Sequence, residues 1–279
     1  MTATNVPTLT LNNGVEIPQL GFGTYQIAPA DTVQAVTSAL EIGYRHLDTA
    51  QMYGNEQQVG EAVRASGIDR DDIFVTSKLN NGFHAYDDAL EAFDRSLKEL
   101  GFDYLDLFLI HWPLPQVGDF VETWKAMEEI YRSGRAKAVG VSNFQQKHLQ
   151  RVLDETDVVP AVNQIEVHPY LSQDTLRHFG TEHQIATEAW SPIAQGKVLD
   201  DEVLARIAAT YDKTVAQVTL RWHLQRGDIV FPKTVTRSRA EENFDVFGFE
   251  LAETDMASID ALNRDERVGP DPDAFNYVP

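Results

Sequence analysis

The stretch Gly43-Tyr-Arg-His-Leu-Asp-Thr-Ala-Gln-Met-Tyr-Gly-Asn-Glu-Gln-Gln-Val-Gly60 holds the pattern that decides the fold. It begins as a short apolar run typical of a buried strand and ends in a loop that leads into a helix. The turn between them places an acid, Asp48, five residues before a phenol, Tyr53. A buried strand followed by an ordinary loop tyrosine would show the same local pattern, so the interpretation depends on what the other strands carry.

The same unit of apolar run, loop and amphipathic helix recurs along the chain. Helical stripes, such as the one from Leu90 to Leu100 with Gly101 as a C-cap, fill the gaps between the runs. Eight runs alternating with helices predict a parallel sheet closed into a (β/α)8 TIM barrel, with an open doubly wound sheet as the alternative. The runs are Gln19–Thr24, Tyr44–Thr49, Ile73–Lys78, Tyr104–His111, Ala136–Asn143, Ala161–Val167, Ile185–Trp190 and Ile229–Lys233.

The two ends of the chain lie outside this pattern. Thr8–Ile17 alternates on both sides of Asn13-Gly14, which predicts an N-terminal β-hairpin whose tight turn uses positive φ angles at those two residues. Residues 264–279 are rich in Pro, Asp and Gly, and we expect a C-terminal loop folded over the barrel mouth. No shift in composition marks a boundary, so residues 1–279 are expected to form a single domain.

Composition excludes several classes of protein. The 279 residues include no Cys, which excludes disulfides, thiolate nucleophiles and Cys-ligated metals. The 43 Asp and Glu residues outnumber the 23 Lys and Arg residues, and the net charge of −20 argues against nucleic acid or an anionic membrane as a partner. Because salt screens such self-repulsion, the acidity indicates a halophilic source with an acidic proteome.

Location and assembly leave weaker traces in the sequence. No apolar run reaches the ~20 residues of a membrane span, and no secretory signal is visible, so we expect a cytoplasmic protein. The expected helices show no surplus apolar face, which favours a monomer.

Each of the eight predicted strands carries a polar or aromatic residue at or near its C-terminal end. Packing alone would not select eight such endings in succession, and functional groups of a barrel gather at the C-terminal ends of its strands. Neighbouring strands lie ~4.8 Å apart, so the second, third and fourth endings should lie side by side. In chain order the endings are Thr24, Asp48, Lys78, His111, Asn143, Gln164, Trp190 and Lys233.

The groups near Tyr53 suit protonation of a carbonyl oxygen. A free phenol with a pKa of ~10 is a poor acid, and we expect the ammonium of Lys78 to lower the pKa of Tyr53. Asp48 would keep Lys78 charged, and a neutral His111 could donate an N–H to an oxygen that gains negative charge. No attacking nucleophile is visible, so a cofactor must bring the group that attacks the carbonyl carbon.

Most other motifs fail, but one basic stretch is informative. Gly21-Phe-Gly23 lacks the third glycine of a dinucleotide fingerprint, and no phosphate loop or zinc motif occurs, so no metal is expected. Lys233, Arg237 and Arg239 gather where the last strand leads into a helix. Backbone N–H groups at a helix start also face anions, so this stretch predicts a phosphate site.

The chain resembles the aldo-keto reductases over essentially its whole length. The matching motifs are Leu20–Thr24, Arg45–Glu56, Thr76–Lys78, Leu109–Pro113, Gly140–Phe144, Asn163–Glu166 and Phe231–Val235. Within that family, Trp190–Lys197 and Arg267–Asn276 are similar to the bacterial 2,5-diketo-D-gluconic acid reductases. The resemblance implies a barrel that uses NADPH, or NADH more weakly, to reduce an aldehyde or ketone such as a small carbonyl, an aldose or a keto-sugar acid.

The resemblance also implies residue roles. Asp48, Tyr53, Lys78 and His111 would be the catalytic tetrad, with Tyr53 as the proton donor. The substrate would meet Tyr25, Tyr53, His111 and Trp112. The cofactor would meet Gly23, Thr24, Asp48, Ser142, Asn143, Gln164, Trp190, Ser191, Pro192, Ile193, Gln195, Gly196, Lys233, Thr234, Val235, Arg239, Glu242 and Asn243.

Within that cofactor set, Ser142, Asn143 and Gln164 would hold the nicotinamide carboxamide, and Trp190 would stack on the ring. Residues 191–197 would form the loop over the pyrophosphate. Lys233, Thr234 and Arg239 would meet the 2′-phosphate, and Glu242 and Asn243 would meet the adenine. Two rival functions are a lyase that forms a Schiff base on Lys78 and a non-catalytic nucleotide-sensing subunit.

Overall fold

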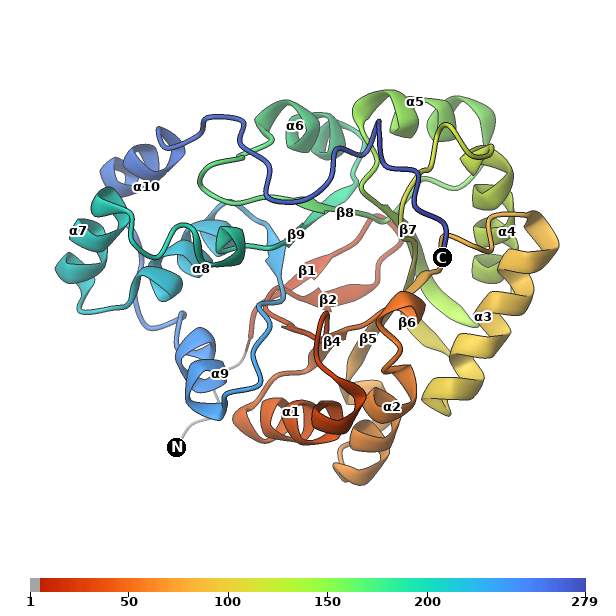
Figure 1. Cartoon of the computed structure of the whole chain (residues 1–279), viewed down its shortest axis with the longest axis horizontal. Coiled ribbons are helices and arrows are strands. Elements are labelled where there is room, and N and C mark those ends of the chain that lie inside the picture. The colour runs from red at the N-terminus through yellow and green to blue at the C-terminus, as the bar shows by residue number, and fades with distance from the viewer. Residues whose placement is uncertain (1–5) are drawn as a thin grey trace.

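Eight parallel strands form a closed barrel surrounded by helices (Figure 1). The computed structural model describes residues 6–279. The sheet order is β10-β9-β8-β7-β6-β5-β4-β3, and a parallel bridge from Leu20 to Val230 joins its two edges. The prediction of a (β/α)8 barrel is confirmed, and the open sheet is excluded. The strands are β3 (Phe22–Gly23), β4 (His46–Asp48), β5 (Phe74–Leu79), β6 (Leu105–Ile110), β7 (Ala136–Ser142), β8 (Val162–Glu166), β9 (Ala186–Trp190) and β10 (Ile229–Val230).

The closure of the barrel depends on one glycine. A Cβ at Gly23 would lie 2.6 Å from the carbonyl oxygen of Phe231, so only glycine lets β3 approach the segment after β10 this closely. β10 is shorter than the predicted run of residues 229–233, because Pro232 has no N–H to continue the ladder.

Helices cover the outside of the barrel. Apolar side chains that recur at helical spacing, such as Ala89, Phe93 and Leu97, face the strands, and Gly101 ends that helix at a φ of 68°. None of the helices in residues 6–279 is long and apolar enough to cross a bilayer. The helices are α1 (Pro29–Ile42), α2 (Glu56–Ala65), α3 (Tyr86–Leu100), α4 (Phe120–Arg132), α5 (Gln146–Glu155), α6 (Asp174–Glu182), α7 (Glu202–Tyr211), α8 (Val215–Gln225), α9 (Arg237–Phe244) and α10 (Glu253–Asp260).

The hairpin of β1 (Thr8–Thr10) and β2 (Glu16–Pro18) plugs the N-terminal end of the barrel. Leu11 and Ile17 pack with inward side chains of the strands, such as Leu107 and Val162. The turn departs from the prediction: Gly14 has a φ of 85°, but Asn13 is outside the left-handed region because the loop spans Leu11 to Val15.

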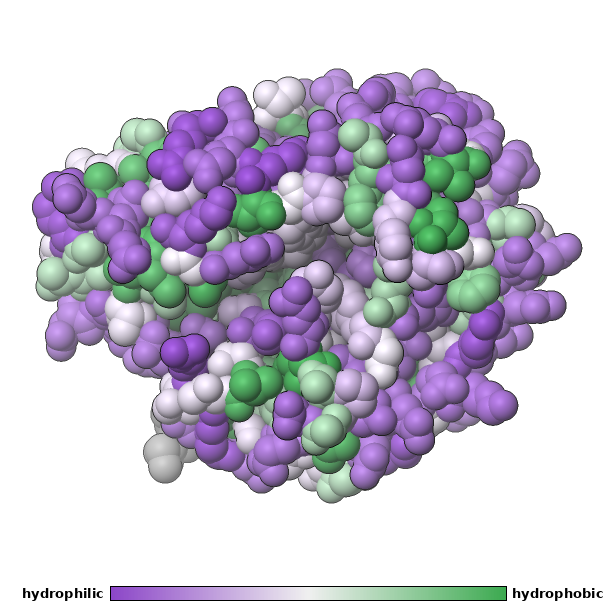
Figure 2. Space-filling view, viewed as in Figure 1, coloured by the Kyte–Doolittle hydropathy of each residue, from purple (hydrophilic) through white to green (hydrophobic). Residues whose placement is uncertain are grey.

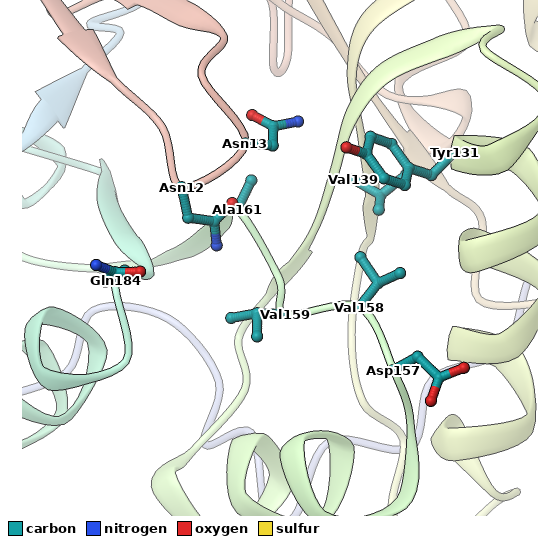
Figure 3. Close-up of a pocket in the computed structure, with 9 residues that line it drawn as sticks. All are labelled: Asn12, Asn13, Tyr131, Val139, Asp157, Val158, Val159, Ala161 and Gln184. Carbon is teal, nitrogen blue, oxygen red and sulfur yellow. The ribbon is translucent and has the colours of Figure 1, made fainter.

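A cleft of about 310 Å³ lies where the hairpin meets the barrel (Figure 3). Asn12 and Asn13 line it together with residues that precede or begin strands, such as Ala161. Both asparagines donate to backbone carbonyls of the barrel, those of Pro160 and Lys137. These contacts fasten the hairpin, so this end of the barrel serves stability.

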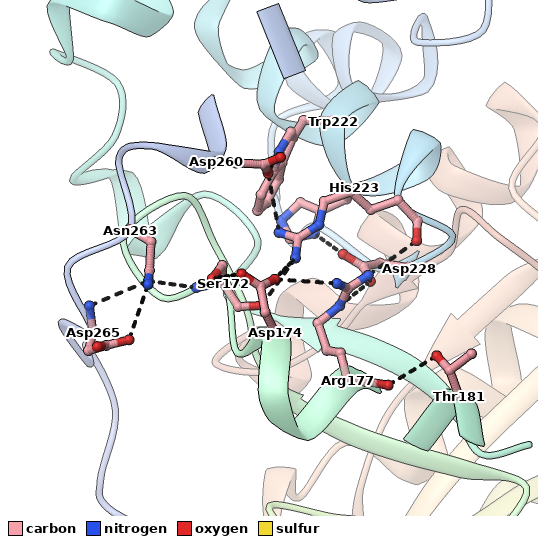
Figure 4. Close-up of polar contacts among 11 residues, drawn as sticks. Ser172, Asp174, Arg177, Thr181, Trp222, His223, Asp228, Asp260, Asn263 and Asp265 are labelled. Atoms are coloured by element: carbon pink, nitrogen blue, oxygen red, sulfur yellow. Dashed lines mark hydrogen bonds and ion pairs between the residues drawn. The ribbon is translucent and has the colours of Figure 1, made fainter. Parts of the chain in front are cut away.

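A buried polar network ties the C-terminal helices to the barrel (Figure 4). Asp228, just before β10, accepts hydrogen bonds from Arg177 of α6 and lies 2.9 Å from Nδ1 of His223 in α8. The side chain of Asn263, beyond α10, accepts from the backbone N–H of Ser172. From there the chain forms a strap, residues 264–279, without helix or strand, as predicted.

Candidate active site

Four side chains meet at the C-terminal end of the barrel. Asp48 ends β4, Lys78 lies near the end of β5, and His111 follows β6. Tyr53 lies in a turn of 3₁₀-helix, Gln51–Tyr53, between β4 and α2. Asp48 and Lys78 are 1% and 0% exposed, so the group is built into the barrel floor. The space-filling view, taken from the same side as Figure 1, shows that the molecule is hollowed near its centre (Figure 2).

All three N–H groups of the Lys78 ammonium have acceptors. Nζ lies 2.7 Å from Oδ1 of Asp48, 2.8 Å from the carbonyl oxygen of Thr49 and 3.4 Å from the hydroxyl of Tyr53. Burial alone would lower the pKa of Lys78, but Asp48 and Tyr53 outweigh burial and raise it. A charged amine with every donor engaged is a poor Schiff-base nucleophile, which counts against the lyase.

Tyr53 is a weaker acid than the sequence predicted. Burial raises its pKa to about 12, although Lys78 acts in the opposite direction. The expectation that Lys78 would bring the pKa of Tyr53 below its ordinary value is therefore wrong. Removing the phenolate from water raises this pKa more than the ammonium of Lys78 lowers it. The hydroxyl stays protonated and ready to donate.

His111 is held neutral beside Tyr53. Their rings meet edge to face with centroids 5.7 Å apart. Burial, together with the charge of Lys78, holds the pKa of His111 well below its ordinary value. A neutral imidazole can donate one N–H to a carbonyl oxygen, as expected.

Next to these four side chains lies a wall of hydrogen-bonded residues, formed by Ser142, Asn143, Gln164 and Trp190. Asn143 donates to the carbonyl oxygen of His111 and to Oγ of Ser142, and its Oδ1 accepts from Nε1 of Trp190. Ser142 in turn donates to the carbonyl oxygen of Gln164. Trp190 is only partly buried, so its ring offers a flat surface to the barrel mouth. A planar ring that carries an amide would fit this wall.

The loop after β9 is held in an unusual shape. Ser191, Ala194 and Gln195 have φ angles of 50°, 49° and 54°, which side chains rarely adopt. Nε2 of His223 lies 3.1 Å from the carbonyl oxygen of Pro192 and anchors the loop to the buried network around Asp228. Ile193 and Gly196 complete this turn beside Trp190.

The basic stretch divides into engaged and free cations. Arg237 pairs with Glu41 and with Glu241, which opposes the expectation that it adds to a phosphate site. Lys233 and Arg239 are exposed, and neither has an ion-pair partner within residues 6–279. A phosphate would find two available cations here.

The remaining expected contacts of the cofactor flank that stretch. Thr24 is buried and donates to the carbonyl oxygen of Asp48, while Thr234 accepts from the N–H of Thr236 and Val235 is exposed. Glu242 accepts from the hydroxyl of Thr214, and Asn243 is largely buried beside it. Thr24, Thr234 and Glu242 thus already have hydrogen-bond partners within the protein.

Aromatic side chains surround the mouth above Tyr53. Tyr25 is 53% exposed, and its ring lies 5.1 Å from that of Tyr53. Trp112 is buried by Phe275 of the C-terminal strap, with ring centroids 4.1 Å apart. The sequence identified Tyr25 and Trp112 as substrate contacts but did not identify Phe275.

The sequence also missed Glu188. This residue lies in β9 and is 0% exposed, beneath the site. Gln164 donates through Nε2 both to Oδ2 of Asp48, at 2.9 Å, and to Oε2 of Glu188, at 2.7 Å. The available signal was an acid inside an apolar run, two residues before Trp190 and therefore on the same face of the strand.

No set of three or more His, Cys, Asp or Glu side chains in the described part of the chain is placed to hold a metal ion.

Comparison with known proteins identifies the family. Residues 19–264 match the model of the aldo/keto reductase family. The chain is 47% identical to glyoxal reductase of Bacillus subtilis over 271 residues, covering 97% of this chain and 98% of that protein. It is 45% identical over 273 residues to methylglyoxal reductase DkgA of Escherichia coli, again covering 97% and 98%. The chain belongs to the aldo/keto reductase family of oxidoreductases.

A solved structure agrees with this conclusion. The crystal structure of an aspartate-to-alanine mutant of Gox0644 in complex with NADPH superimposes with a TM-score of 0.94 at 45% identity. The match covers 98% of this chain and all of that one.

Proposed function

We propose that the protein is an NADPH-dependent reductase of small aldehydes and ketones, with 2-oxoaldehydes such as methylglyoxal and glyoxal as the favoured class. The observation that carries the proposal is the buried Asp48–Lys78 pair, which contacts the hydroxyl of Tyr53 at the barrel mouth. The names of the two reductase relatives support the substrate class. The NADPH complex of the structural relative supports the cofactor.

In this proposal the residues divide the work. Bound NADPH supplies the hydride that attacks the carbonyl carbon. Tyr53 donates its proton to the carbonyl oxygen, and the ammonium of Lys78 stabilises the phenolate that remains. Asp48 keeps Lys78 charged and in place, and neutral His111 donates a hydrogen bond that orients the carbonyl.

The wall residues hold the cofactor in the proposal. Ser142, Asn143 and Gln164 bind the carboxamide, and Trp190 stacks on the nicotinamide ring. The loop 191–197 covers the pyrophosphate, and Lys233, Thr234 and Arg239 bind the 2′-phosphate. We propose that residues 1–279 form a single domain with this function.

A panel of carbonyls tests the proposed function. Purified protein is mixed with NADPH and with methylglyoxal, glyoxal, simple aldehydes, aldoses or keto-sugar acids, and the loss of NADPH absorbance is followed. We expect turnover, with the highest kcat/KM for the 2-oxoaldehydes, the class that the names of the two reductase relatives indicate. NADPH binding without turnover of any carbonyl would favour the nucleotide-sensing subunit, and borohydride trapping of an adduct on Lys78 would favour the lyase.

A further inference from the structure

We propose that Glu188 is a positioning residue that fixes the orientation of the Gln164 amide, so that the site presents an acceptor to the cofactor's carboxamide. The inference rests on the proposed function, because it assumes that Gln164 faces the nicotinamide. It concerns a residue outside the expected tetrad and outside the expected cofactor contacts.

The geometry places Glu188 directly beside Gln164. The two residues are register partners on the neighbouring strands β8 and β9. An amide nitrogen carries two hydrogens, and Nε2 of Gln164 uses one on Asp48 and the other on Glu188. Within residues 6–279, no protein donor reaches Oε1 of Gln164. The amide therefore turns both donors toward the floor and keeps its oxygen for a ligand.

The reverse orientation is unfavourable while both acids are present. It would turn Oε1 of Gln164 toward two carboxyl oxygens and bring lone pairs together in a buried site. Asp48 is bound to the ammonium of Lys78, so it remains an acceptor. Glu188 supplies the second acceptor, so both hydrogens on Nε2 of Gln164 have a partner.

Glu188 accepts this bond whether or not it carries a proton. The ionisable groups that face it are His46 and Asp48 of β4 and Lys78 of β5, and only one of these is a firm cation. Burial, reinforced by Asp48, raises the pKa of Glu188 to about 8. Oε1 has no hydrogen-bond partner and lies 3.9 Å from Nε2 of His46, so the proton can sit there while Oε2 accepts from Gln164. The observed orientation of Gln164 is thus compatible with either charge state of Glu188.

The other amide on the wall is already engaged at both of its ends. Oδ1 of Asn143 is occupied by Nε1 of Trp190, and its nitrogen donates to the carbonyl of His111 and to Ser142. Oε1 of Gln164 has no protein donor within residues 6–279, so both of its lone pairs are available to the NH₂ of a carboxamide. A cofactor with a methyl group in place of that NH₂ would leave it unpaired, which typically costs about 1–3 kcal/mol.

The test compares NADPH with reduced 3-acetylpyridine adenine dinucleotide phosphate, in which an acetyl group replaces the carboxamide. Dissociation constants are measured by calorimetry. We expect the wild-type protein to bind NADPH about 5- to 150-fold more tightly than the analogue, the factor that this free energy corresponds to. In Glu188→Met, which fills the volume without an acceptor, the ratio should fall toward one. Glu188→Ala is a second variant, should the methionine fail to pack.

Two controls separate positioning from stability. Glu188→Gln keeps an acceptor oxygen and should keep the ratio. Glu128→Gln changes another buried glutamate, which accepts from the N–H groups of Asp157 and Val158 on the outside of the barrel, and should leave the ratio unchanged even if it lowers the melting temperature.

The outcomes distinguish the two proposals. A wild-type protein that binds neither nucleotide refutes the proposed function and the inference together. A protein that binds both nucleotides equally, or a Glu188→Met and Glu188→Ala pair that keeps the wild-type ratio, refutes the inference alone.

Discussion

At the scale of single residues, the acidity of Tyr53 is set by two opposing effects. Burial raises the pKa of Tyr53 to about 12, and the nearby ammonium of Lys78 limits that rise. The phenol therefore holds its proton in the resting site. In the proposed reaction it would give the proton up to a carbonyl oxygen that gains negative charge, because the hydroxyl lies 3.4 Å from Nζ of Lys78, which would stabilise the phenolate.

Replacing Tyr53 by Phe tests this assignment. The ring remains and the donor is lost, so kcat should fall by about 10²–10⁴-fold while the dissociation constant for NADPH stays within a factor of a few. Stopped-flow turnover and calorimetric titration measure the two quantities. Tyr86→Phe is the matched control, since it removes the hydroxyl of an exposed tyrosine on α3 outside the expected site, and it should change kcat little. A Tyr53→Phe variant that turns over like the wild type would show that another group donates the proton.

At the scale of elements, the sequence predicted the strands and their endings well. The apolar runs located all eight strands, and their last residues do gather at one end, because parallel strands share a direction. Glu188 was missed because it lies inside a run that reads as core, and its partners come from other strands. Strap residue Phe275 was missed because no local pattern tells which side chain a loop lays against Trp112.

The segment from β10 into α9 illustrates the same limit. Its charge was visible in the sequence, but the pairing of Arg237 with Glu41 depends on α1 lying next to α9. Only the folded chain shows that Arg237 is paired, whereas Lys233 and Arg239 have no ion-pair partner within residues 6–279.

This segment yields a prediction about cofactor choice. Replacing Lys233 and Arg239 together by Ala should weaken NADPH binding by about 10²-fold, because two charge-assisted contacts with the 2′-phosphate are lost. NADH binding should change little, and titration with both cofactors measures the difference. Arg237→Ala is the control, because its guanidinium is already paired, and it should preserve the preference. Equal losses for NADPH and NADH in the double variant would show that these cations do not read the 2′-phosphate.

At the scale of the whole molecule, the C-terminal strap joins parts of the barrel mouth that are far apart in sequence. Carboxylate oxygens of Glu166, at the end of β8, accept from the N–H groups of Val268 and Gly269. A Cβ at Gly269 would overlap the ring of Trp190, so the strap presses directly on the residue proposed to stack on the cofactor. Further along, Asn81 donates to the carbonyl oxygen of Tyr277. The strap thus braces both the proposed cofactor wall and the aromatic mouth.

The net charge of −20 gives a prediction for the whole fold. Self-repulsion among acidic side chains destabilises the compact state, and salt shortens the range of that repulsion to ~3 Å at 1 M. Exposed ion pairs lose little when screened, since each contributes about 0–1 kcal/mol. The urea midpoint should therefore rise between 0.05 and 2 M KCl at neutral pH, and unfolding followed by circular dichroism measures it. At pH 5 part of the acidic charge is neutralised, so the gain should be smaller. A midpoint that falls as KCl rises would mean that the acidic surface is no adaptation to salt and that attraction between the described ion pairs outweighs the repulsion.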